Sequence, residues 1–213
     1  MENIFRAVNI AMVNELKLVF ERMNINIWEV IEAANSKPFG FMPFYPGPGM
    51  GGHCIPIDPF YLSWKAKEFN TEAKFIELAG EVNRKMTENV AHRIGKALND
   101  HSKSIRKSNI LMLGLAYKKD IDDMRESPAL KIAELLRFKG ANISYHDPNI
   151  NDAKELKFVE LNKESLRKAD AVVITTDHSN VDYEMVGKYA RLIIDTRNVM
   201  AGVKNPKADV LRA

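Results

Sequence analysis

The pattern of apolar and polar residues changes character about halfway along the chain. In the first half, apolar residues recur with the period of an α-helix, which predicts helices over 1–36 and from 60 to about 102. The first is expected to break at 24–26, and the second at 70–71, where Thr71 is expected to cap the next helix. Over residues 4–20 the apolar stripe is wider than one buried face needs, so this helix is expected to be covered on two sides, the second by another subunit.

In the second half, short apolar runs alternate with helical segments. The predicted strands are 109–115, 141–146, 170–175 and 191–195, and the predicted helices are 127–137, 163–168 and 181–189. Such alternation indicates a parallel sheet covered by helices, and ligands of such sheets bind beyond the carboxyl ends of the strands. The residues expected at that edge are 116–120, 147–148, 176–178 and 196–198. The fold class is therefore α/β, with a helical module over 1–102 and an α/β domain over 108–213.

A long loop interrupts the helical module. Residues 37–59 contain six prolines and five glycines, which argues against a regular element. The aromatic residues Phe39, Phe41, Phe44 and Tyr45 favour an ordered loop over a flexible linker, since linkers lack such anchors. Long ordered loops inside a domain are usually functional.

Four glycines and the only cysteine lie within residues 47–54 of this loop. Glycine gathers where the backbone must approach another group closely. Cys54 comes shortly before a predicted helix, and a helix N-terminus favours the thiolate, so we interpret it as a nucleophile beside an anionic or sugar ligand rather than a buried inert thiol. Asp58 fits a site carboxylate and a helix cap equally well. His53 is expected to shape the site, because neighbours in an extended loop rarely point the same way.

Composition narrows the class of protein. A net charge of +3 with scattered Lys and Arg argues against a nucleic-acid partner. No apolar run reaches the roughly 18 residues that a membrane span needs, and the N-terminus lacks a secretory pattern. One cysteine cannot form an intramolecular disulfide or a thiolate zinc site, so we expect a cytoplasmic protein without a metal.

Motifs along the whole chain carry a resemblance to a known family. They are FRAVNI (5–10) with Asn14-Glu15, KPFGF (37–41), PGPGMGGHCIPIDP (46–59), GLAYKKD (114–120), RESP (125–128) and DTR (195–197). Together they resemble the nucleotide-sugar 6-dehydrogenases, the UDP-glucose/GDP-mannose dehydrogenase family. The histidine before the cysteine and the PGPG run are most similar to the branch acting on UDP-N-acetylhexosamines, UDP-N-acetylglucosamine above all.

The resemblance implies an enzyme that oxidises the sugar C6 alcohol to a carboxylate with two NAD⁺, by way of a cysteine thiohemiacetal and thioester. It implies that Cys54 is the nucleophile, that Asp58 handles water and protons, and that Asn3 stabilises the oxyanion. The implied substrate contacts are Phe44, Tyr45, Gly47, Gly49, Gly51, Gly52, Tyr117, Lys118 and Arg197, and the implied cofactor contact is Arg125.

The chain also departs from the family pattern. Family members begin with an NAD-binding Rossmann domain that has a glycine fingerprint, and they carry a catalytic lysine one turn before Asn3; neither is found in this sequence. We therefore expect the central and C-terminal portion of such an enzyme, with the N-terminal NAD-binding domain absent, the NAD site mostly outside the chain, and no activity alone. The expected partners are a UDP-sugar and a second copy, as a homodimer through the first helices. The alternatives are a non-catalytic dimerising module that binds UDP-sugars, and a sibling enzyme specific for UDP-N-acetylmannosamine or UDP-glucose.

Overall fold

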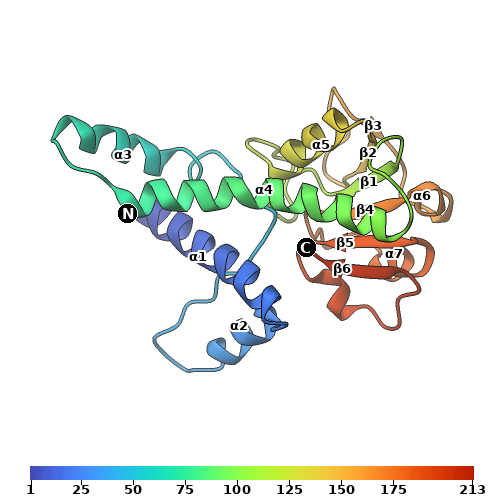
Figure 1. The fold of residues 1–213 in the computed structure, drawn as a ribbon, viewed down its shortest axis with the longest axis horizontal. Coiled ribbons are helices and arrows are strands. Elements are labelled where there is room, and N and C mark those ends of the chain that lie inside the picture. The colour runs from blue at the N-terminus through green and yellow to red at the C-terminus, as the bar shows by residue number, and fades with distance from the viewer.

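The computed structural model describes all 213 residues as a helical part and a sheet part joined by one long helix (Figure 1). The helical part contains α1 (Glu2–Arg22), α2 (Ile27–Asn35), α3 (Asp58–Glu68) and α4 (Lys74–Asp100). The break between α1 and α2 lies where it was predicted, and the Asn26 side chain caps α2 by accepting from the Trp28 N–H. The predicted cap at Thr71 is wrong, because α4 begins three residues later, after Ala73, without a side-chain cap.

The sheet part is built from six parallel strands in the order β3-β2-β1-β4-β5-β6. The strands are β1 (Asn109–Leu113), β2 (Asn142–His146), β3 (Lys157–Phe158), β4 (Ala171–Ile174), β5 (Leu192–Asp195) and β6 (Asp209–Arg212). The four predicted strands are confirmed with slightly shorter bounds. The two edge strands, β3 and β6, were not predicted, because such short segments carry too few residues for a readable alternation.

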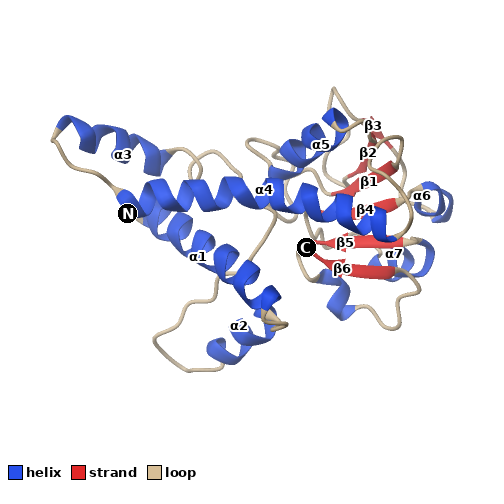
Figure 2. Cartoon of the chain, in the orientation of Figure 1, coloured by secondary structure: helices blue, strands red, loops and turns tan.

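Helices cover both faces of this sheet (Figure 2). The second half of α4 and α5 (Pro128–Phe138) pack on one face, while α6 (Lys163–Lys168) and α7 (Tyr183–Tyr189) pack on the other, where a short 3₁₀ helix, η1 (Val199–Gly202), also lies. Successive residues of β1 alternate between the two cores: Ile110 and Met112 point to the α4 side, and Leu111 and Leu113 to the α6 side. A strand buried on both faces explains the continuous apolar run in the sequence.

Helix α4 belongs to both parts of the molecule. Its first half packs along α1, while Val90, Ile94 and Leu98 in its second half are fully buried in the core of the sheet. The division of the chain at 102–108 stays a prediction. None of the helices is long and apolar enough to cross a membrane.

One face of α1 has no cover within the chain. Phe5, Met12 and Val19, each seven residues apart, are 48%, 48% and 46% exposed. The opposite face, which includes Ala7, Ala11 and Asn14, is buried. The wide apolar stripe thus has one side packed on α4 and one side open.

Candidate active site at the cysteine loop

The thiol of Cys54 is exposed and lies in the turn that leads into α3. The carbonyl oxygen of Cys54 accepts hydrogen bonds from the N–H groups of Ile57 (3.1 Å) and Asp58 (2.8 Å), which closes this turn. Helix α3 begins at Asp58, two residues before the predicted start. The cysteine turn therefore leads directly into a helix N-terminus, whose dipole favours negative charge nearby.

Asp58 and Asn3 meet across two helices. The Asn3 side-chain amide donates to the Asp58 carboxylate at 2.8 Å, although the two residues are 55 positions apart in the sequence. Asp58 is the first residue of α3 rather than its cap, since Ile57 holds the cap position without a side-chain hydrogen bond. The carboxylate is exposed and one turn from the thiol, so of its two interpretations the site carboxylate fits the geometry.

His53 differs from what the sequence indicated. Its Nδ1 lies 3.7 Å from the Cys54 sulfur, so the two neighbouring side chains do point toward each other. The reason is that residues 53–57 form a turn, not an extended segment. His53 is thus close enough to exchange a proton with the thiol.

Gly51 and Gly52 allow the loop to pack closely against the sheet part of the molecule. A methyl group at Gly51 would lie 2.7 Å from Tyr117 Cβ and 2.9 Å from the Glu126 carbonyl oxygen. Gly52 has φ +96° and would place a methyl group 2.9 Å from the Tyr117 ring, while its N–H donates to the Arg125 carbonyl at 2.9 Å. These glycines are required by contact with protein atoms, and they fix Tyr117 beside the cysteine turn.

The earlier glycines of the loop are held by a buried polar pair that was not predicted. The Gly47 N–H donates to Asn14 Oδ1 at 2.9 Å, and the Asn14 amide donates to Asn83 Oδ1 at 2.9 Å. Gly49, with φ +140°, packs against Thr87, whose hydroxyl donates to the Pro48 carbonyl. The sequence does hold a sign of this pair, since Asn14 and Asn83 each interrupt the apolar face of a helix, α1 and α4.

Phe44 and Tyr45 anchor the loop to the first helices. The Phe44 ring meets Phe5 edge to face with centroids 5.5 Å apart, and Tyr45 stacks on Trp28 at the same separation. The Tyr45 hydroxyl donates to Glu32 at 2.7 Å, and this hydrogen bond raises the pKa of Tyr45. The other two predicted anchors contribute less, since Phe39 is 76% and Phe41 is 41% exposed.

Arg125 lies near the thiol but is already paired. Its guanidinium donates to both carboxylate oxygens of Asp123, at 2.6–3.1 Å. These hydrogen bonds lower the pKa of Asp123 and are the largest cause that raises the pKa of Arg125, with smaller contributions from Tyr117 and Cys54. Arg125 is therefore a positive charge beside the cysteine turn whose position is set by Asp123.

Lys118 and Arg197 are cations without ion pairs at the carboxyl edge of the sheet. Lys118 is exposed after β1, and Arg197 is half-buried after β5. The Arg197 Nε donates to the Thr175 carbonyl at 3.0 Å, and a methyl group at Gly47 would lie 2.7 Å from its guanidinium. Burial lowers the pKa of Arg197. Cations without carboxylate partners are suited to binding an anionic ligand such as a diphosphate.

Cys54 lines none of the five main cavities of the chain. One cavity of about 510 Å³ is lined by the loop residues Met50 and Pro56 together with Phe60, Asn83 and Thr87, and not by Cys54. The sulfur instead lies on the open surface beside Asp58.

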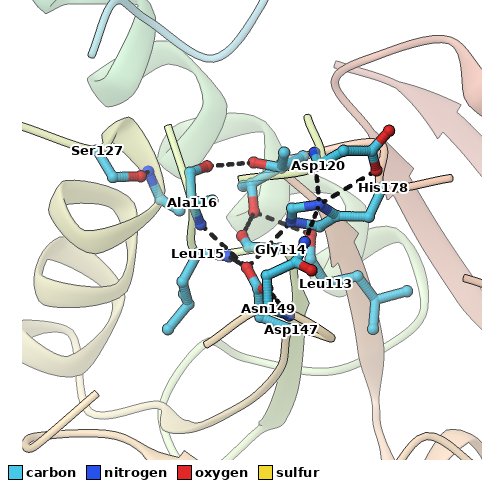
Figure 3. A network of polar contacts seen from close by, with 12 residues as sticks. Leu113, Gly114, Leu115, Ala116, Asp120, Ser127, Asp147, Asn149 and His178 are labelled. Carbon is cyan, nitrogen blue, oxygen red and sulfur yellow. Dashed lines mark hydrogen bonds and ion pairs between the residues drawn. The ribbon is translucent and has the colours of Figure 1, made fainter. Parts of the chain in front are cut away.

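The sheet has the strand order of dinucleotide-binding folds, which allows a test for an NAD site. In those folds an acidic residue after the second strand holds the ribose, and glycines after the first strand let the pyrophosphate approach. Here Asp147 follows β2 but is 1% exposed, and its carboxylate accepts from the N–H groups of Leu115 (2.6 Å), Ala116 (3.0 Å) and Asn149 (2.9 Å) (Figure 3). The residues at this edge do not fit a dinucleotide.

His178 completes that network and is also unavailable to a ligand. It is fully buried, and its Nε2 lies 3.1 Å from the Asp147 carboxylate. Burial raises the pKa of Asp147, but the hydrogen bonds from His178 and the three N–H groups outweigh it and lower the pKa to about 2. Asp147 and His178 lie at the predicted edge of the sheet, but both are buried and bind each other.

Comparison with known proteins gives two family matches that cover most of the chain. Residues 1–85 match the model of the UDP-glucose/GDP-mannose dehydrogenase family central domain, and residues 111–202 match that of the UDP binding domain of the same family.

Individual relatives agree with these matches. A UDP-N-acetyl-D-mannosamine dehydrogenase from Pyrococcus horikoshii is 39% identical over 209 residues, which is 94% of this chain and 47% of the relative. An NDP-N-acetyl-D-galactosaminuronic acid dehydrogenase from Ralstonia nicotianae is 36% identical over 205 residues, 93% of this chain and 46% of the relative. The chain thus spans about half the length of the curated relatives it matches.

Solved structures share the fold. The structure of UDP-D-ManNAc dehydrogenase from Pyrococcus horikoshii superposes with a TM-score of 0.85 at 35% identity, over 99% of this chain and 50% of that one. A UDP-glucose dehydrogenase from Pyrobaculum islandicum gives a TM-score of 0.79 at 27% identity, over 92% of this chain and 46% of that one.

Proposed function

The chain belongs to the UDP-glucose/GDP-mannose dehydrogenase family, and on this basis we propose that it is the thiol-bearing, substrate-binding portion of a UDP-sugar 6-dehydrogenase. The observation that carries the proposal is the exposed Cys54 thiol one turn from the Asn3–Asp58 pair. A nucleophile and a carboxylate from the turn into α3 lie close to an amide donor from α1.

The chemistry at sulfur follows from these groups. The Cys54 thiolate adds to the C6 aldehyde of the sugar: a C–S bond forms, the C=O π bond breaks, and the resulting alkoxide takes a proton. We assign the stabilisation of that alkoxide to the Asn3 amide, which in the free chain donates to Asp58. At the later thioester, water adds to the carbonyl carbon, the C–S bond breaks, and the thiolate leaves as the carboxylic acid forms. Asp58 is the base placed to take a proton from that water.

The chain accounts for these two steps and not for the oxidations. Those need a two-electron acceptor, which in this family is NAD, and the edge of the sheet does not fit it because Asp147, the acidic residue after β2, is buried and already hydrogen-bonded to Leu115 and His178. We therefore expect the chain to make no NADH by itself. A non-catalytic module that binds UDP-sugars is the alternative function.

The substrate class is a UDP-N-acetylhexosamine. Lys118 and Arg197, both within the matched UDP binding domain, supply two cations without ion pairs for the diphosphate. Relatives named for N-acetylmannosamine and N-acetylgalactosaminuronic acid support a sugar with a 2-acetamido group. UDP-N-acetylglucosamine remains the leading member of the class, and UDP-N-acetylmannosamine and UDP-glucose are the alternatives.

Alkylation of the single cysteine tests this proposal directly. Because the chain has one cysteine, each added label reports on Cys54 alone. With a UDP-N-acetylhexosamine at ten times its dissociation constant, labelling by iodoacetamide should slow about tenfold, and UDP-glucose should protect less. Equal labelling rates with and without every UDP-sugar would contradict the site.

Two neighbouring lysines give a matched control. Lys118→Met should raise the UDP-sugar concentration that half-protects Cys54 about tenfold, because the substitution removes a cation that would bind the diphosphate. Lys119→Met should leave protection unchanged, because Lys119 lies 3.9 Å from Asp177 and pairs with it instead. NADH formation by the chain with NAD⁺ and substrate would show that it is catalytically complete; protection without NADH supports the portion proposed here.

A further inference from the structure

The buried His178–Asp147 pair has no role in the chemistry at sulfur, yet it joins three loops at the carboxyl edge of the sheet. His178 follows β4, Asp147 follows β2, and Asp120 lies in the loop after β1. Both side chains of the pair are fully buried. Figure 3 shows the imidazole between these loops, with dashed lines to each of them.

The hydrogen-bond donors around the ring define its protonation. The Asp120 main-chain N–H lies 3.0 Å from Nδ1 and can only donate, so Nδ1 is an unprotonated acceptor. The Asn149 amide lies 3.0 Å from the same Nδ1 and donates as well. The ring proton is therefore on Nε2 and is donated to Asp147. The Nε2–H tautomer matches the Asp120 N–H and Asp147, and a second ring proton would face the Asp120 N–H, with the Asp120 carboxylate 3.8 Å from the same Nδ1.

We propose that the His178–Asp147 pair is a positioning device for the loop 115–120, which carries Lys118 and holds Tyr117 against the cysteine loop. Asp147 holds the loop at the N–H groups of Leu115 and Ala116, and His178 holds it at Asp120. Because the two residues also bind each other, the beginning and the end of the loop are fixed to one rigid unit. This inference rests on the proposed function, since it assigns the pair an effect on nucleotide binding.

The connection from the pair to the thiol is continuous. Tyr117 follows the two held N–H groups directly, and its side chain is the surface on which Gly51 and Gly52 pack. Its N–H donates to the Asp123 carbonyl at 3.0 Å, and Asp123 in turn positions Arg125. A movement of the loop would therefore displace Lys118, the cation proposed to bind the diphosphate. It would also displace Tyr117, against which the cysteine loop packs.

The test compares His178→Leu with His178→Gln and a control histidine. His178→Leu removes the ring's three hydrogen bonds, to the Asp120 N–H, the Asn149 amide and the Asp147 carboxylate, and we expect the dissociation constant for UDP to rise roughly tenfold by calorimetry. His178→Gln keeps a donor for Asp147 and an acceptor, and should restore most of the affinity. His146→Leu is the matched control, because His146 is part-buried at the end of β2, its side chain hydrogen-bonds the Val159 carbonyl, and its ring lies 5.7 Å from that of Phe158, away from the loop 115–120. It should bind UDP like the original chain.

Two further measurements remain decisive if a variant folds poorly. In the unmodified chain at pH 7, the ¹⁵N shifts of His178 should report the neutral Nε2–H tautomer; an Nδ1–H tautomer or a charged ring would overturn the proposal. Hydrogen exchange should be faster in the 114–120 peptide of His178→Leu but not in α4. A folded His178→Leu chain with normal UDP affinity and normal exchange would also overturn it. If the unmodified chain binds no UDP-sugar, the proposed function is wrong. The tautomer of His178 and the hydrogen exchange of the loop still test the positioning role in that case.

Discussion

Lys17 is a residue whose charge works against the fold. It lies on α1, is 6% exposed and forms no ion pair. Burial, followed by the nearby charge of Arg93, lowers the pKa of Lys17 to about 8 from 10.5. Above pH 8 the folded chain releases a proton that the unfolded chain keeps until about pH 10.5, so the free energy of unfolding rises with pH in that window.

Replacing Lys17 by methionine should therefore stabilise the chain at neutral pH. The side chain keeps its length and loses its charge, which removes a penalty of about 3 kcal/mol that corresponds to the shift from 10.5 to about 8. Urea unfolding at pH 7 and pH 10.5 checks this: the gain of Lys17→Met over the original chain should be large at pH 7 and small at pH 10.5. Lys96→Met, at an exposed position on α4, should show no such difference. A gain that is equal at both pH values would mean that lost charge is not its cause.

At the scale of elements, the cysteine loop depends on close contact between main chains. Gly51→Ala would bring a methyl group to 2.9 Å from the Glu126 carbonyl oxygen, and a main-chain oxygen cannot move as a flexible side chain does. We expect a loss of roughly 1–3 kcal/mol in the free energy of unfolding, measured with urea. Gly202→Ala is the control, because no atom lies within 4 Å of the added methyl group. If both substitutions lower the free energy of unfolding equally, the loop does not pack against the Glu126 carbonyl as described.

Elements with strong local signals were predictable from the sequence. The helix at 163–168 has its predicted bounds, and Ser127 caps α5 as expected by accepting from the Ala129 N–H. The strand of residues 109–113 was readable because both of its faces are buried. The edge strands β3 and β6 were not, because two to four partly exposed residues next to one neighbour leave no pattern.

The candidate site was only partly predictable, for a different reason. A cysteine after a glycine cluster identifies the loop, but the sequence does not reveal which distant residue each polar side chain will meet. Asp147 and His178 were placed correctly at the ligand edge, yet they bind each other across 31 residues and are buried. Asn14 and Asn83 are 69 residues apart and hold the loop through the Gly47 N–H, but no sequence motif marks either residue for this role. Local patterns determine elements, whereas pairing between loops is decided by the assembled fold.

At the scale of the whole molecule, the exposed stripe on α1 bears on assembly. Phe5, Met12 and Val19 form a continuous apolar row on a helix whose other side is buried against α4. Apolar rows at seven-residue spacing are suited to packing against an identical helix. Asn3 lies in the first turn of the same helix, so a dimer through α1 would place its interface near the Asn3–Asp58 pair.

A charge in the middle of this row tests the dimer. Met12→Glu should convert a dimer to a monomer in analytical ultracentrifugation, because a carboxylate would be buried against its own copy without a partner. Phe138→Glu is the matched control: Phe138 is 92% exposed at the end of α5, away from α1, and its substitution should leave the mass unchanged. An original chain that sediments as a monomer at high concentration would exclude the homodimer. If Met12→Glu is monomeric and Cys54 is still protected by UDP-sugars, each copy binds its ligand independently; if protection is lost with the dimer, the interface supports the site through α1.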